Sequence, residues 1–126
     1  MTHPRLKSSV TETVSAIRSY AGLQPNWDGQ GAQPVTEATT ARAVDTLRAM
    51  VERARPLHAD LPIPIVGPTP GGSIHLQWTL SRGYVGVECP PPPEPLSFYA
   101  EIDGREIESD ATSLDDLWET VRGAFV

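Results

Sequence analysis

Three runs of alternating apolar and polar residues between positions 63 and 103 constrain the fold most strongly. A period of two places every second side chain on the same face of a β-strand. The apolar members of the three runs are Ile74, Leu76, Trp78 and Leu80; Val85, Val87 and Cys89; and Leu96, Phe98, Ala100 and Ile102. This pattern predicts antiparallel strands with one buried face and one polar face.

Short turn sequences border these runs. Pro70-Gly71-Gly72 precedes the first run, Ser81-Arg82-Gly83 joins the first to the second, and Asp103-Gly104 follows the third. Asp-Gly is a strong two-residue hairpin signal because both positions need a positive φ. The sequence therefore predicts four or five strands in total. Because of the prolines between positions 57 and 70, any strand near residues 63–66 must be an edge strand or an extended lead-in.

Apolar residues spaced three and four apart predict two helices in the first half of the chain. The first begins at Pro4, ends near Tyr20 and uses Gly22 as a left-handed cap; its apolar stripe is Leu6, Val10, Val14 and Ile17. The second begins at the N-cap Thr36 and ends before Pro56; its stripe is Val44, Leu47, Val51 and Ala54.

A third helix is predicted near the C-terminus, where Ser113 and Asp116 have the spacing of a capping box. Its apolar face consists of Leu114, Leu117, Trp118, Val121 and Phe125. We therefore predict a single α+β domain over residues 1–126. It contains two N-terminal helices, a four- to five-stranded antiparallel sheet, and a C-terminal helix packed on one face.

No apolar run approaches the roughly 18 residues that a membrane-spanning helix needs, and no apolar signal-peptide core follows the basic N-terminus. Cys89 is the single cysteine, so no disulfide forms within the chain. Its place on the apolar face of a strand predicts a buried thiol. These features predict a cytoplasmic protein without membrane association.

Charge is distributed unevenly along the chain. Between Glu88 and Arg122 there are ten acidic and two basic residues, whereas the rest of the chain has eight basic and six acidic residues. An acidic surface repels nucleic acid and favours basic partners. We therefore expect no direct nucleic-acid binding and favour a basic protein partner, although ordinary solubility also explains the charge. Self-association is left open.

The sequence contains no catalytic or metal-binding motif. The spacing of His3, His58 and His75 matches no short set of metal ligands. Ser73 and Ser97 lack a nucleophile-elbow motif. A calcium loop through residues 26–29 is excluded because its first and twelfth positions would be glutamine and valine. We expect no cofactor, no metal and no catalytic residues.

Two sets of residues are candidates for binding. The polar face of the predicted sheet contributes His75, Gln77, Thr79, Glu88, Tyr99 and Glu101. The turn-rich 26–34 loop contributes Trp27 and Asp28. We expect the Trp27 ring to pack against Val14, Ile17 and Leu47 while its N–H meets a carbonyl, and Asp28 to accept backbone N–H groups.

Two longer motifs carry a family resemblance. They are Asn26-Trp27-Asp28-Gly29-Gln30-Gly31-Ala32-Gln33-Pro34 and Gly71-Gly72-Ser73-Ile74-His75-Leu76-Gln77-Trp78. In both, the chain resembles a group of small uncharacterised bacterial and phage-associated proteins that share an Asn-Trp-Asp-Gly-x-Gly-Ala-x-Pro loop and a Gly-Gly-x-Ile-x-Leu-x-Trp strand. The group has a glutamate where this chain has Gln77. The resemblance implies kinship and assigns no activity.

Two functional hypotheses follow from these features. The first is a non-enzymatic protein-interaction module, such as an antitoxin-like or immunity-like inhibitor, whose acidic second half neutralises a basic partner. The second is a small-ligand-binding or hydrolytic protein with a site between the 26–34 loop and the sheet. The second requires Trp27, Asp28, His75, Gln77 and Glu101 to converge.

Overall fold

The computed structural model describes residues 10–57 and 61–126. Its strands are β1 (Ile65–Pro68), β2 (Ile74–Leu80), β3 (Gly83–Cys89), β4 (Leu96–Ile102) and β5 (Arg105–Ala111). They form one antiparallel sheet in the order β1-β2-β3-β4-β5. The helices are α1 (Val10–Ser19), α2 (Glu37–Ala54) and α3 (Leu114–Val121), and short 3-10 turns η1 (Tyr20–Gly22) and η2 (Arg122–Phe125) follow α1 and α3.

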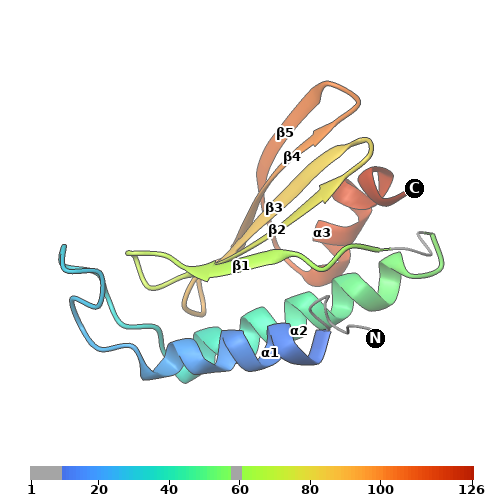
Figure 1. The fold of residues 1–126 in the computed structure, drawn as a ribbon. Coiled ribbons are helices and arrows are strands. Elements are labelled where there is room, and N and C mark those ends of the chain that lie inside the picture. The colour runs from blue at the N-terminus through green and yellow to red at the C-terminus, as the bar shows by residue number, and fades with distance from the viewer. Residues whose placement is uncertain (1–9, 58–60) are drawn as a thin grey trace.

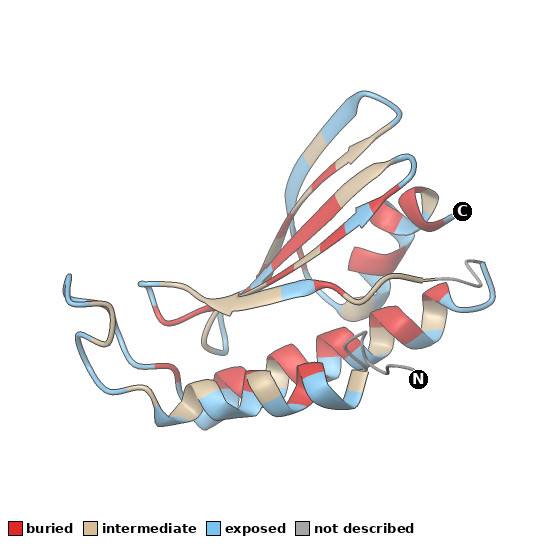
Figure 2. Ribbon diagram, in the orientation of Figure 1, coloured by how far each residue is buried: buried red, intermediate tan, exposed pale blue. Residues whose placement is uncertain are grey.

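The helices lie together on one side of the sheet (Figure 1). α1 contacts β1, α2 contacts β2 and β3, and α3 with η2 contacts β3, β4 and β5. Buried positions occur along the central strands and along α2 and α3 (Figure 2). The predicted α+β architecture is confirmed, including the edge position of β1.

The strand alternation matches the sequence prediction. Every apolar residue predicted to face inward on β2 and β3 is buried. The turn at Asp103-Gly104 has positive φ at both residues, 52° and 85°, as a two-residue hairpin requires. Ser73, directly before β2, is buried, and its N–H donates to Thr69 Oγ1 at 3.1 Å.

Capping residues fix the starts of α2 and α3 as predicted. Thr36 Oγ1 accepts the Thr39 N–H at 3.1 Å, and Ser113 Oγ accepts the Asp116 N–H at 3.0 Å. The first helix ends near Tyr20 as predicted, but the predicted left-handed cap is wrong, because Gly22 does not adopt a positive φ. There the chain closes a 3-10 turn, in which the Leu23 N–H donates to the Tyr20 carbonyl at 3.1 Å. The first part of that predicted helix lies outside the described residues.

An aromatic cluster joins the C-terminal elements to the sheet. The Phe125 ring contacts Trp78 of β2 edge-on, with centroids 5.9 Å apart, and Trp118 of α3 at 5.6 Å. The proline-rich connection between β3 and β4 is attached to α2, because Arg42 Nη1 donates to the Pro90 carbonyl at 2.9 Å. The helical layer thus contacts all five strands, and among the described residues no helix lies on the opposite face of the sheet.

Candidate functional site

The side of the sheet opposite the helices, termed here the open face, is formed by alternate residues of all five strands. The strand registers align them in three rows: Gly67, His75, Glu88, Ser97 and Asp110; Ile65, Gln77, Gly86, Tyr99 and Glu108; and Thr79, Tyr84, Glu101 and Glu106. The predicted binding residues His75, Gln77, Glu88, Tyr99 and Glu101 therefore lie together on this face.

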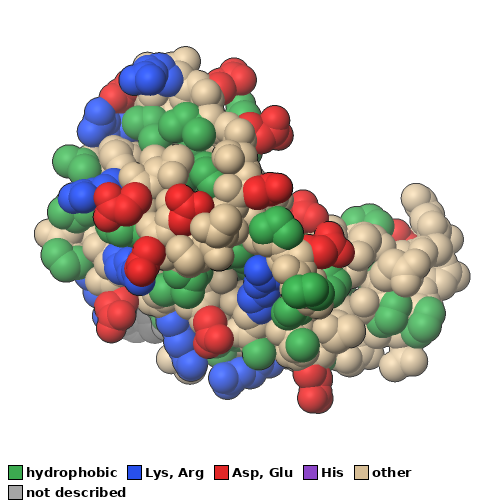
Figure 3. Space-filling model, turned by 180° about the vertical axis from the view of Figure 1, so that it is seen from behind, with side chains coloured by type: hydrophobic (Ala, Val, Ile, Leu, Met, Phe, Trp, Pro, Cys, Tyr) green, Lys and Arg blue, Asp and Glu red, His purple; other side chains and the backbone are tan. Residues whose placement is uncertain are grey.

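Acidic side chains dominate the open face. Five strand positions of the open face carry carboxylates, and no strand position of this face carries lysine or arginine. The acidic residues are Glu88, Glu101, Glu106, Glu108 and Asp110. In the view from behind, acidic side chains gather along a hollow in the molecular surface (Figure 3). Negatively charged carboxylates along a concave surface create a negative potential that attracts cations.

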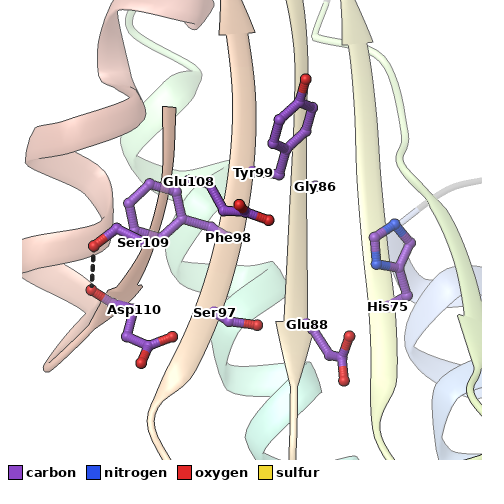
Figure 4. A pocket seen from close by; sticks show the side chains of 9 residues that line it. All are labelled: His75, Gly86, Glu88, Ser97, Phe98, Tyr99, Glu108, Ser109 and Asp110. Carbon is purple, nitrogen blue, oxygen red and sulfur yellow. Dashed lines mark hydrogen bonds between the residues drawn. The ribbon is translucent and has the colours of Figure 1, made fainter. Parts of the chain in front are cut away.

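A shallow cavity of about 320 Å³ lies on the open face across β2 to β5 (Figure 4). Gly86 forms its floor, and the His75 ring stands beside it on the neighbouring strand. A methyl group at Gly86 would lie 3.2 Å from His75 Cε1. The other lining residues are Glu88, Ser97, Phe98, Tyr99, Glu108, Ser109 and Asp110.

Two tyrosines stand at one side of this cavity. The rings of Tyr84 and Tyr99 have centroids 5.4 Å apart and are tilted by 44°. Interaction with the Tyr84 hydroxyl, together with partial desolvation and the negative charge of Glu106, raises the pKa of the Tyr99 phenol above its usual value. The phenol therefore remains neutral beside the carboxylates and offers an aromatic face to a cation.

The 26–34 loop is held by its own hydrogen bonds. Trp27 Nε1 donates to the Gln33 carbonyl at 2.8 Å. Asp28 Oδ1 accepts the N–H groups of Gln30 at 2.8 Å and Ala32 at 3.1 Å. The predictions that the indole N–H meets a carbonyl and that Asp28 accepts backbone N–H groups are both confirmed.

The predicted packing of Trp27 is wrong. Its ring is half-buried and does not belong to the group of apolar residues that pack against the core, so contacts with Val14, Ile17 and Leu47 are not the basis of its position. The loop instead attaches to the turn between β1 and β2, where the Gln33 N–H donates to the Pro70 carbonyl at 2.8 Å. Trp27 and Asp28 do not line the Gly86 cavity.

Replacing Trp27 with alanine is consequently expected to have a moderate effect. The change removes one hydrogen bond and a half-buried ring, which together should lower the free energy of unfolding by about 1–2 kcal/mol. Asp28→Ala should cost about 1 kcal/mol, as for a lost turn or cap bond. Urea denaturation measures both. A loss above about 3 kcal/mol for Trp27→Ala would indicate an emptied core site and contradict the structure.

The described part of the chain gives little support for a metal site or a nucleophilic thiol. No three metal-binding side chains come together there, and His3 and His58 lie outside it. Burial raises the pKa of the Cys89 thiol to about 11, which makes it a poor nucleophile. None of the described helices combines the length and apolar character that crossing a bilayer requires.

Sequence reasoning missed the residues that complete the site: Tyr84, Gly86, Ser97, Glu106, Glu108 and Asp110. The Asp103-Gly104 turn was the sequence signal for β5. A two-residue turn fixes the register of the next strand and places Glu106 opposite Glu101. The polar alternation of β5 then puts its acidic residues on the same face as Tyr99.

No protein-family model matches this chain, and neither the curated proteins nor the solved structures include a significant match to it.

Proposed function

We propose that the protein is a non-enzymatic interaction module of the cytoplasm whose open face binds a basic protein partner. The observation that carries this proposal is the set of five carboxylates on the open face, without lysine or arginine at its strand positions. An acidic sheet of this kind suits an antitoxin-like or immunity-like inhibitor, which covers a basic surface of its target.

The distribution of the carboxylates favours an extended partner over a single ion. They occupy three rows on three strands, and no three metal-binding side chains converge in the described residues. At the β1 end of the open face, Ile65 is 71% exposed. A partner that places an apolar side chain there and basic side chains over β4 and β5 would match the whole face.

The alternative, a small-ligand or hydrolytic site between the 26–34 loop and the sheet, has less support. Asp28 is engaged with its own loop, and neither it nor Trp27 lines the cavity that contains His75. His75 Nε2 lies 3.4 Å from Gln77 Oε1, a long contact with an amide, which does not orient or activate it as a catalytic base.

A matched pair of triple variants tests the proposal. Glu101, Glu106 and Glu108 are changed to glutamine in one variant, and Asp45, Glu52 and Glu94, which are exposed away from the open face, to the corresponding amides in the other. Both raise the net charge equally. We expect the open-face variant to bind a partner purified from the source organism about 10- to 100-fold more weakly, because it loses close charge pairs, and the control to bind almost normally.

Calorimetry at several salt concentrations provides the measurement. Binding should weaken as salt rises, because ions screen the attraction between exposed charges. An acidic partner, equal losses in the two triple variants, or binding indifferent to salt would each contradict the proposed function.

A further inference from the structure

We propose that the cavity over Gly86 is a socket for one arginine side chain of the partner. The inference rests on the proposed function and specifies the contact at its centre. It is drawn from three observations: a glycine that leaves space in the middle of the sheet, an aromatic ring beside that space, and carboxylates around it.

Gly86 provides the space for a partner side chain. Gly86 lies inside β3, flanked in its row by Gln77 and Tyr99. Its φ is outside the positive region, so the backbone there does not require glycine. Glycine weakens the interior of a strand and often marks a close approach by another group. The cavity of about 320 Å³ lies over Gly86, and a side chain at this position would project into it beside the His75 ring, 3.2 Å from His75 Cε1.

The walls of the cavity combine an aromatic ring with carboxylates. Tyr99 presents its ring on one side, while Glu88, Glu108 and Asp110 contribute carboxylates from β3 and β5 (Figure 4). A guanidinium group stacks on an aromatic face and donates paired hydrogen bonds to carboxylates at the same time. A lysine ammonium is compact and strongly hydrated and has no planar face to stack on Tyr99. It should therefore bind in this wide, shallow cavity more weakly than a guanidinium group.

Peptide titrations followed by amide chemical shifts test the chemistry of the socket. The probes are acetyl-Gly-Arg-Gly-amide and the same peptide with lysine or with citrulline, which is isosteric with arginine and uncharged. We expect shifts centred on Gly86 and Tyr99, with the arginine peptide binding about tenfold more tightly than the citrulline peptide, since charge-assisted bonds are lost. The lysine peptide should bind more weakly than the arginine peptide.

A matched pair of glycine variants tests the location. Gly86→Val places a side chain on the floor of the cavity, whereas Gly67→Val adds the same side chain at a position on the open face that has nothing within 4 Å of its Cβ site. We expect Gly86→Val to weaken binding of the arginine peptide at least about tenfold, as for a lost central contact, and Gly67→Val to leave it unchanged. Gly86→Ala serves if the valine variant does not fold, with a smaller loss in the same direction.

The outcomes separate the socket from the proposed function. Equal binding of the arginine and citrulline peptides, or equal effects of the two glycine variants, would overturn the socket. Loss of binding to the whole partner in the open-face triple variant, with no loss in Gly86→Val, would retain the function and remove the socket. Concentration-dependent shifts around Gly86 without any peptide would assign the cavity to a second copy of this chain and also overturn the inference.

Discussion

Gly83→Ala is expected to destabilise the fold by more than about 4 kcal/mol, a range reached by few single substitutions. Gly83 begins β3 with φ at 149°, a conformation that residues with a side chain rarely adopt. A Cβ atom there would lie 1.7 Å from the Glu101 carbonyl oxygen of β4. The obstacle is backbone, so no side-chain rotation relieves it, and the end of the β3–β4 ladder must separate.

Two other glycines provide controls for this prediction. Gly104 has φ at 85° but nothing within 4 Å of its Cβ site, so Gly104→Ala should cost only the left-handed strain, about 1–2 kcal/mol. Gly67 has neither a positive φ nor a close neighbour, and Gly67→Ala should change stability by about 0.5 kcal/mol at most. Urea denaturation of the three variants should rank them in this order. A Gly83→Ala protein as stable as Gly104→Ala would show that the predicted clash is relieved by a small shift.

The sheet was predictable because its signals are local. Alternation over β2, β3 and β4, together with the positive-φ turn at Asp103-Gly104, determines which residues face the helices and which face outward. A buried face also fixes register, since a slip by one residue would invert it. The shared position of His75, Glu88 and Tyr99 followed directly from this pattern.

The features that were not predicted depend on tertiary contacts. A glycine at position 22 suits a left-handed cap, yet Gly22 has no positive φ and the chain forms a 3-10 turn. In this turn the Tyr20 hydroxyl donates to the Val66 carbonyl of β1 at 3.5 Å. A tryptophan in a polar loop predicts a ring buried in the core, but the 26–34 loop itself provides the acceptor for the Trp27 indole N–H. The Gly86 cavity depends on neighbours from three other strands, which no local pattern specifies.

Trp78→Ala is the second change with a large expected effect. Trp78 is fully buried on β2, where its ring packs edge-on against Phe125 of the C-terminal turn. Its removal empties a large site between the sheet and the C-terminal elements, and we expect the free energy of unfolding to fall by about 3–5 kcal/mol. Urea denaturation and thermal melting measure this loss.

Trp78→Phe and Trp27→Ala separate the contributions to that loss. Trp78 Nε1 is buried and meets no hydrogen-bond acceptor among the described residues, so phenylalanine removes an unpaired polar group while keeping much of the ring. Trp78→Phe should therefore cost less than about 2 kcal/mol, below the range for removing a whole large core side chain. Trp27→Ala deletes the same ring from a half-buried loop position and should cost less than Trp78→Ala. If Trp27→Ala proved the more damaging of the two alanine variants, the 26–34 loop rather than the aromatic cluster would hold the fold together, contrary to the burial of the two rings.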